Sequence, residues 1–332
     1  MYSKLLFASM LMLAALTGNA QFLLTGKVVN VEDHQPIAFA NIGIVNTSVG
    51  TCGYEDGSFR LIVPANMIND NITFSAIGFS KFELKIDTLH LDENLILLKE
   101  DVAMLREIQI TPSDQVKSDV IGLTSPGVFN NWGEALASSD GGSAWATKIE
   151  MPETVIDIKK VNLHIFKNDL DSFNIRCRIM SIGQDNLPSK DLLNKSVILR
   201  SSIKKGWVSI DFSSYEISLA EDFFLVFEWI MDKKGAQLAA EFEANSLPWR
   251  LPDSDIWNNN LMVYLDENGE MVKQKLTKSQ QKQCKEREFP QTWFGIKKTK
   301  TDETNYSRKG SMAPWIEQPA FDLVANIEYQ WY

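Results

Sequence analysis

The sequence predicts an all-β protein built from two β-sandwiches. Short runs of alternating apolar and polar residues recur at spacings of roughly 8–12 residues, with turn residues between them, and this pattern is typical of sandwiches. All nine tryptophans lie at or after Trp132, so the composition changes within the chain of 332 residues. These two observations predict the following division of the chain: a signal peptide at 1–20, a first sandwich at 21–111, a linker at 112–131 and a second sandwich at 132–332.

The first twenty residues resemble a secretory signal peptide. A single charge at Lys4 precedes an apolar run that ends at Leu16, and small residues lead to Ala20, where we expect cleavage. No later segment has the eighteen apolar residues that a membrane-spanning helix needs. The first cysteine is Cys52, so we expect no lipid anchor at the cleavage site. The expected destination is the periplasm, the outer-membrane surface or the extracellular space.

Charge and cysteine content narrow the partners and the covalent chemistry. The formal net charge is −10, which argues against a nucleic-acid partner. Three cysteines cannot all pair within one chain. Cys177 and Cys284 could form a disulfide and leave Cys52 free; the simpler alternative is three reduced and mostly buried thiols. No histidine or lysine neighbours Cys52 in sequence, so we expect that thiol to be idle.

The first half consists of short strand-like segments separated by turns. The stretch 37–45 alternates, and the stretch 49–61 is predicted to form a hairpin around Asp56-Gly57, where glycine tolerates a positive φ. Pro64 ends the strand that follows. Further strands are expected at 26–30, 71–76, 82–86 and 94–98.

Five blocks of this half, in order, resemble the carboxypeptidase-regulatory-like domain over residues 24–111. They are Gly26-Lys27-Val28-Val29, Pro36 to Ile42, Gly50-Thr51 with Glu55 to Phe59, Phe74 to Phe79, and Leu105 to Ile110. The resemblance implies a transthyretin-like, Ig-like sandwich of seven strands, a domain common in exported proteins and outer-membrane receptors of Gram-negative bacteria. Cys52 and Gly53 depart from the family's usual residues.

The second half contains longer alternating strands. They are expected at 145–150, 158–166, 173–179, 207–212 and 223–229. Their order, with an arginine-rich strand, a Leu-Pro-Ser loop and a Gly-Trp strand, resembles a jelly-roll-like β-sandwich, an architecture that hosts many functions. In the last strand, Ile327, Tyr329 and Trp331 share one face.

No catalytic residue, metal ligand or cofactor is expected. His90 and Glu93 have a spacing that zinc ligands use, but His164, the only downstream histidine, belongs to the other domain. Calcium remains an alternative at two acidic turns; solvated turns are the simpler interpretation. These turns contain Asn168, Asp169 and Asp171, and Asp253 and Asp255.

A proline-rich loop of the second half is the candidate ligand-binding site. Trp249, Trp257, Asn258 and Asn260 lie within 14 residues of each other, and Trp315 follows Pro314 in a second loop. Indole rings stack on the C–H faces of sugars while amides bind hydroxyls. Packing of these tryptophans over the core is the alternative.

These observations favour a non-enzymatic exported envelope protein. It would act as a binding or structural module whose partner is an envelope glycan, through carbohydrate binding, or an envelope protein. One alternative is a glycoside- or peptide-directed hydrolase with its carboxylates in the second sandwich. Another is an accessory component of outer-membrane uptake or adhesion.

Overall fold

A computed structural model describes the greater part of the chain. The described ranges are 21–90, 93–101, 116–126, 132–135, 141–152, 154–237, 255–257, 260–265, 271–286, 292–298, 305–318 and 321–331. The expected signal peptide lies outside them. The chain divides into two compact units, one made of residues up to Asp232 together with Thr292–Tyr332, and the other of Lys233–Gln291.

The first sandwich has a three-stranded sheet and a four-stranded sheet, so it contains the seven strands that the family resemblance implies. The first sheet has the order β4-β1-β7, formed by Ser58–Pro64, Gln21–Asn30 and Asn94–Leu98. The second has the order β3-β2-β5-β6, formed by Gly50–Cys52, Asn41–Gly43, Asn71–Ser75 and Phe82–Lys85. Their apolar faces enclose one core that includes Phe59 and Phe74, whose rings meet edge to face.

The expected strand at 37–45 is shorter than predicted. Only Asn41–Gly43 pairs as β2, because Phe39 has a φ of 58°, and a bulky residue in the left-handed region ends regular strand geometry. Ala40, Ile42 and Ile44 nevertheless enter the core as expected. The kink at Phe39 leaves its carbonyl outside the β2–β3 ladder, where Cys52 Sγ donates to it at 3.4 Å.

The prediction of a hairpin at 49–61 is wrong, because the strands on the two sides of its turn pair with other strands. The turn itself is present, with Tyr54 N–H donating to the Ser58 carbonyl at 2.8 Å and Gly57 at φ 77°. However, β3 pairs with β2 and β4 pairs with β1, so the two arms belong to different sheets. The turn is therefore a corner between the two sheets of the sandwich. A turn fixes the local reversal of the chain direction, but it does not fix the strand with which each arm pairs.

The second sandwich packs a seven-stranded sheet against an eight-stranded sheet. The seven-stranded sheet has the order β13-β12-β17-β10-β22-β23, with β14 beside β12. Its strands are Pro188–Asp191 (β13), Phe173–Ile182 (β12), Phe223–Ile230 (β17), Ala144–Ile149 (β10), Asn305–Arg308 (β22), Ile316–Glu317 (β23) and Val197–Ser201 (β14). We call it the arginine sheet, after Arg176, Arg178 and Arg308 in β12 and β22.

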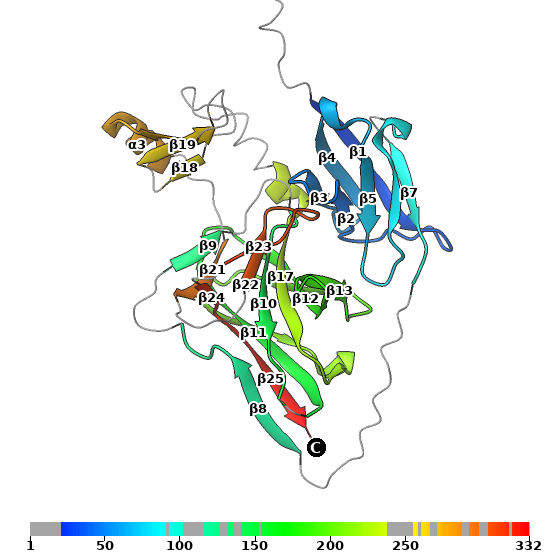
Figure 1. Cartoon of the computed structure of the whole chain (residues 1–332), viewed down its shortest axis with the longest axis vertical. Coiled ribbons are helices and arrows are strands. Elements are labelled where there is room, and N and C mark those ends of the chain that lie inside the picture. The colour runs from blue at the N-terminus through cyan, green and yellow to red at the C-terminus, as the bar shows by residue number, and fades with distance from the viewer. Residues whose placement is uncertain are drawn as a thin grey trace, which may run out of the picture. The chain divides into compact units, whose positions relative to one another are not determined.

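The eight-stranded sheet has the order β24-β21-β11-β25-β8, with β15 and β16 beside β11 and β9 beside β21. Its strands are Phe321–Leu323 (β24), Thr292–Lys298 (β21), Ile156–Asn168 (β11), Ala325–Trp331 (β25), Lys117–Gly122 (β8), Gly206–Asp211 (β15), Ser218–Leu219 (β16) and Trp132–Ala135 (β9). Successive strands β10, β11 and β12 cross from one sheet to the other and back (Figure 1). The all-β, two-sandwich prediction is confirmed.

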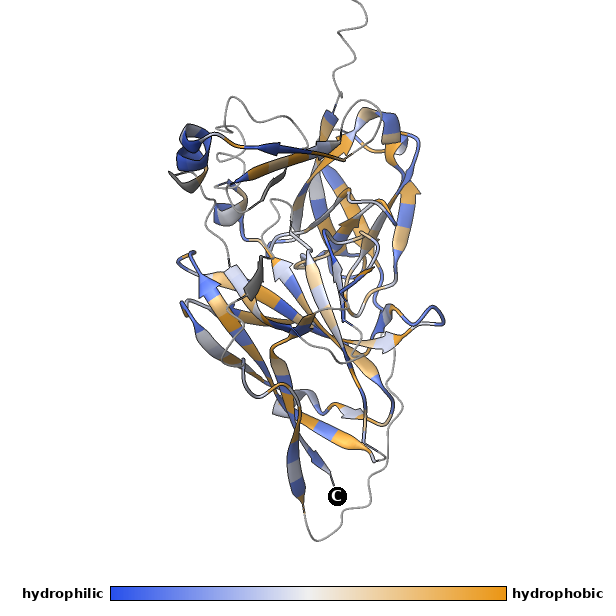
Figure 2. Cartoon of the chain, turned by 60° about the vertical axis from the view of Figure 1, so that its left-hand side comes forward, coloured by the Kyte–Doolittle hydropathy of each residue, from blue (hydrophilic) through white to orange (hydrophobic). Residues whose placement is uncertain are grey.

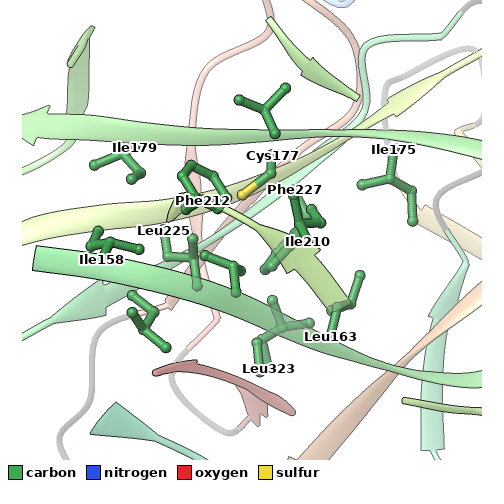
Figure 3. Close-up of a cluster of buried hydrophobic side chains, with 14 of the residues drawn as sticks. Ile158, Leu163, Ile175, Cys177, Ile179, Ile210, Phe212, Leu225, Phe227 and Leu323 are labelled. Atoms are coloured by element: carbon green, nitrogen blue, oxygen red, sulfur yellow. The ribbon is translucent and has the colours of Figure 1, made fainter. Parts of the chain in front are cut away.

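A single apolar core fills the space between these two sheets. Ile175, Cys177 and Ile179 alternate along β12 and meet Ile158 and Leu163 of β11 (Figure 3). Ile327 and Tyr329 of β25 enter the same core, and Trp331 packs against it, as the alternation of the last strand predicts. The alternation of apolar and polar residues along these strands is visible in Figure 2.

The range expected to be a linker contains a strand. Within 112–131, residues Lys117–Gly122 form β8 and pair with β25. The polar composition that suggested a linker fits this strand, most of whose residues are exposed.

The second unit, Lys233–Gln291, interrupts the range 132–332 that we expected to be one sandwich. Its described residues include the sheet β18-β19-β20, formed by Asp255–Trp257, Leu261–Leu265 and Met271–Lys275, and the helix α3 at Lys278–Glu286. Met262, Leu276 and Cys284 make a small core of its own. Among the described residues, no helix is long and apolar enough to span a membrane.

Candidate functional site

The two faces of the arginine sheet carry different chemistry. Side chains alternate across a strand, so Ile175 and Cys177 of β12 face the apolar core while Arg176 and Arg178 face the opposite side. In β17, all eight residues are buried and Glu228 is the only charged one. Glu228 therefore lies on the same face as the two arginines.

Strand register brings the charges into one row. Arg176 of β12 is directly opposite Glu228 of β17, Glu228 is opposite Ala144 of β10, and Ala144 is opposite Arg308 of β22. The methyl group of Ala144 leaves room for Arg308 to reach Glu228 over the intervening strand. We call Arg176, Arg178, Glu228 and Arg308 the arginine–glutamate cluster.

The Glu228 carboxylate binds all three guanidinium groups. Its Oε2 accepts from Arg176 Nε at 2.9 Å and from Arg178 Nη1 at 3.1 Å, and its Oε1 accepts from Arg308 Nη2 at 2.9 Å. The side chains of Arg176 and Glu228 are 1% and 0% exposed. Buried charges are stable only when paired and hydrogen-bonded, and this carboxylate has both of its oxygens in use.

Each arginine also has a partner beyond Glu228. Arg178 forms a bidentate pair with Asp191 of β13, at 2.8 Å and 2.6 Å. The Arg308 guanidinium lies 4.8 Å from the centroid of the Trp315 ring, within the range of a cation–π contact. The cluster is thus contacted on one side by β13 and on the other by Trp315, the residue before β23.

The cluster contacts the first sandwich through Arg176. Its Nη1 donates to the Phe39 carbonyl at 2.7 Å and its Nη2 donates to Asn41 Oδ1. The left-handed φ of Phe39 frees that carbonyl from the sheet ladder. One buried guanidinium therefore joins the two sandwiches.

The pKa values follow from burial opposed by pairing. Burial raises the pKa of the Glu228 carboxyl, but attraction by Arg176, Arg178 and Arg308 prevails and the pKa falls to about 2. Burial lowers the pKa of Arg308 to about 10, although Glu228 raises it, since Arg178 and Arg176 repel its charge. At neutral pH Glu228, Arg178 and Arg308 are therefore ionised.

Apolar contacts reinforce this junction. Ile77, from the block Phe74 to Phe79, packs into the apolar core of the second sandwich together with Leu193. Gly78 has a φ of 85°, and a Cβ there would lie 2.8 Å from the Asn194 carbonyl oxygen, so only glycine fits this approach. Phe39 and Cys52 pack on Ile230 of β17.

A cleft of about 660 Å³ lies beside the cluster. We call it the junction cleft, because residues of both sandwiches line it. They are Asn41, Ser75, Ala76, Ile77, Gly78, Phe79, Lys81, Asp101, Arg176, Arg178, Ser181, Ser189, Lys190, Asp191, Leu192, Leu193 and Asn194. Its volume is in the range of small-molecule sites.

The tryptophan and asparagine residues that sequence analysis singled out do not form one described site. Trp249 and Asn258 lie outside the described residues, and nothing is described of the Trp257 side chain. Asn260 is exposed at the start of β19 in the second unit. Trp315 is half-buried in the first unit, against Arg308 and a small apolar cluster that includes Phe224 and Tyr306.

The three cysteines are buried and none forms a disulfide bond, so the pair Cys177 and Cys284 is not bridged. Burial raises the pKa of Cys52 to about 12, which keeps it protonated and unreactive as expected. Burial likewise raises the pKa of Cys177.

Three of the candidate metal ligands, Asn168, Asp169 and His164, make other contacts in the described structure, whereas Asp253 lies outside the described residues. Asn168 Oδ1 accepts from Leu170 N–H and from Thr292 Oγ1, and Asp169 pairs with Lys167 at 2.7 Å. His164 is buried against Trp207, and burial lowers its pKa. Within the described residues, no group of three or more histidine, cysteine or acidic side chains is arranged to hold a metal ion.

Sequence analysis missed the arginine–glutamate cluster and the junction cleft. One signal was present: Glu228 is a lone charge in the apolar segment 223–230, and Arg176 and Arg178 alternate with apolar residues in their own strand. A charge within an otherwise buried strand needs a partner. The pairing of β12 with β17, which places Arg176 and Arg178 beside Glu228, cannot be derived from the sequence pattern.

Comparisons with known proteins identify only the first sandwich. No curated protein matches the chain. Two crystal structures of BcpA, the major pilin subunit of Bacillus cereus, were found among solved structures. A variant is 11% identical over 77% of this chain and 67% of that chain, with a TM-score of 0.16. The other structure is 10% identical over 94% of this chain and 85% of that chain, with a TM-score of 0.15. Similarity at these scores supports no conclusion about fold or function.

The family model described as the CarboxypepD_reg-like domain matches residues 24–110. This range agrees with the resemblance drawn from the five sequence blocks at 24–111. The block from Phe74 to Phe79 supplies Ile77 and Gly78 to the junction with the second sandwich. The chain therefore contains a carboxypeptidase-regulatory-like domain at residues 24–110.

Proposed function

We propose that the protein is a non-enzymatic exported envelope protein in which the paired sandwiches act as one binding and structural module. The observation that carries this proposal is the hydrogen bonding of Arg176 to Glu228 on one side and to Phe39 and Asn41 on the other. A buried guanidinium shared in this way fixes the orientation of two domains more firmly than exposed contacts do.

The junction cleft is the proposed binding surface of this module. Ligand sites occur preferentially at domain interfaces, where two rigid walls meet. Here one wall comes from the loop at Ala76 to Phe79 and the other from β12 and β13. Because the cluster holds the wall from β12 and β13 and Ile77 anchors the loop wall in the core, a ligand would bind without first ordering them.

Export and the envelope location rest on the signal-like segment at 1–20 and on the family of the first sandwich. The expected periplasmic, outer-membrane or extracellular site is tested by fractionating cells that express the full chain. Recovery with the envelope or the medium, with loss of residues 1–20, supports the proposal; retention of the uncleaved chain in the cytosol contradicts it.

Binding is tested with the chain 21–332 on an array of envelope glycans and by co-sedimentation with isolated envelope material. Ser189 lines the cleft and is exposed on β13, so Ser189→Trp should fill the cleft without touching the arginines. Ser214, an exposed residue of the 3-10 turn at Ser213–Tyr215, gives the matched control Ser214→Trp. We expect binding to be lost in Ser189→Trp alone, with both variants melting as the wild type does.

The tryptophan loop supplies the competing location for the same function. The double variant Trp249→Ala, Trp257→Ala should leave binding intact if the cleft is the site. Loss of binding in that variant, with Ser189→Trp unaffected, would place the ligand on the loop instead. Release of shortened glycan or peptide products during incubation would overturn the non-enzymatic proposal.

A further inference from the structure

We infer that the junction cleft binds a carboxylate-bearing sugar, of the uronic acid class, with Lys190 as the principal contact for the carboxylate. This inference rests on the proposed function, which assigns the cleft as a binding surface but not its ligand.

The charges that line the cleft favour an anion. Four cationic side chains, Lys81, Arg176, Arg178 and Lys190, face two acidic ones, Asp101 and Asp191. The chain as a whole has a formal net charge of −10. A cationic concavity concentrates anionic ligands locally even where the protein around it is acidic overall.

Most of these charged side chains already pair with another side chain. The cationic side chain that forms no such pair is the one that a ligand can use. Arg178 and Asp191 bind each other through two hydrogen bonds, and both Arg176 and Arg178 bind Glu228. Lys81 pairs with Glu83 at 2.5 Å. In the part of the chain that the structure describes, Lys190 forms no ion pair.

The uncharged lining favours a ring with hydroxyl groups over a simple anion. Ser75, Ser181, Ser189 and Asn194 supply hydroxyl and amide groups. Phe79 and Leu192 are half-buried and supply apolar surface in the same cleft. A pyranose ring presents hydroxyls at its rim and C–H groups on its faces, so it uses both kinds of lining. Phosphate or sulfate alone would leave the apolar part unused.

The size and rigidity of the cleft agree with an oligosaccharide segment. A volume of about 660 Å³ exceeds what a single small ion fills. The loop that holds Phe79 is anchored by Ile77 in the core and by the Asp101 N–H, which donates to the Gly78 carbonyl at 2.9 Å. Binding therefore costs little conformational entropy on the protein side.

The test is calorimetric titration of the chain 21–332 with trigalacturonate and with the neutral galactose trisaccharide. We expect trigalacturonate to bind at least about tenfold more tightly, since a charge-assisted hydrogen bond is roughly twice as strong as a neutral one. Lys190→Glu should weaken trigalacturonate binding by about tenfold or more. Lys27→Glu, an exposed residue of β1 outside the cleft, is the matched control and should bind as the wild type does.

Four outcomes overturn the inference. They are equal affinity for the acidic and neutral sugars, unchanged affinity in Lys190→Glu, no binding of trigalacturonate to the wild type, and displacement of trigalacturonate by an equal concentration of inorganic phosphate. The proposed function fails separately. A neutral glycan whose binding is lost in Ser189→Trp would keep the cleft as the site and reject only the acidic ligand.

Discussion

The two faces of the arginine sheet are stabilised by opposite means. One face packs Ile175, Cys177 and Phe227 into an apolar core, where area removed from water supplies the free energy. The other places Arg176 and Glu228 under the first sandwich, where pairing must offset the cost of desolvation. An apolar face tolerates many partners of suitable shape, whereas a buried charge row accepts only the partner that completes its hydrogen bonds. We therefore expect the charged face to specify which domain docks and in which orientation.

The largest effect is expected from removing the single buried carboxylate. Glu228→Gln keeps the shape but leaves three guanidinium groups without their counter-charge, and breaking a buried pair costs about 3–5 kcal/mol. Urea titration of the chain 21–332 measures the free energy of unfolding. A nearby residue of β17 on the apolar face gives the comparison: Leu225→Met conserves volume and should cost less than about 1.5 kcal/mol. Similar small losses in both variants would contradict the difference between the faces.

Acid should selectively weaken the charged face. The pKa of Glu228 is about 2 in the folded state against 4.5 for the unperturbed group. A lowered pKa contributes stability that is complete above the unfolded value and is lost as pH falls toward the folded one. The melting temperature of the wild type should therefore fall between pH 4.5 and 2, and the melting temperature of Glu228→Gln should fall less steeply over that interval. Parallel curves for the two proteins would show that Glu228 is not the responsible group.

A smaller loss is expected at the corner of the first sandwich, away from both faces. Gly57→Val forces a β-branched residue to a φ of 77° and places a Cβ 2.6 Å from the Val28 carbonyl oxygen. Backbone strain of this kind costs about 1–3 kcal/mol. Thermal melting measures the loss, while ligand binding by the folded variant should match that of the wild type. Lost binding at an unchanged melting temperature would contradict a purely structural role.

The smallest effect is expected from an ion pair that also joins the two sandwiches but in solvent. Arg200 of β14 pairs with Glu55, and their side chains are 57% and 67% exposed. Exposed pairs contribute about 0–1 kcal/mol because water and salt screen them. Arg200→Ala should therefore change the free energy of unfolding by less than about 1 kcal/mol in urea titration. A loss as large as that of Glu228→Gln would mean that burial is not what distinguishes the junction.

Local pattern was enough to predict the strands and the family of the first sandwich. Ala40, Ile42 and Ile44 show their alternation directly in the sequence, and Ile327 and Tyr329 do the same in the last strand. The pairing of β3 with β2 was not predicted, because the sequence Asp56-Gly57 is typical of a hairpin turn whether or not the two flanking strands pair with each other. Local geometry constrains a reversal but not its long-range partners.

The candidate site could not be predicted for the same reason at longer range. Glu228 is 52 residues from Arg176 and 80 from Arg308 in the chain. Only the strand order β12-β17-β10-β22 makes them neighbours, and only the small side chain of Ala144 lets Arg308 reach across. The second unit at Lys233–Gln291 was likewise missed, because its boundary follows from strand pairing: β18, β19 and β20 form a sheet of their own.

The most direct test of the account is differential scanning calorimetry of the chain 21–332 beside its Arg176→Met variant. Arg176→Met keeps apolar bulk and removes the hydrogen bonds to Glu228, Phe39 and Asn41. If this buried guanidinium joins the sandwiches, they should unfold in one transition in the wild type and in two separate transitions in the variant. Separate transitions already in the wild type, at temperatures that Arg176→Met leaves unchanged, would contradict the claim that the charged face fixes one domain on the other.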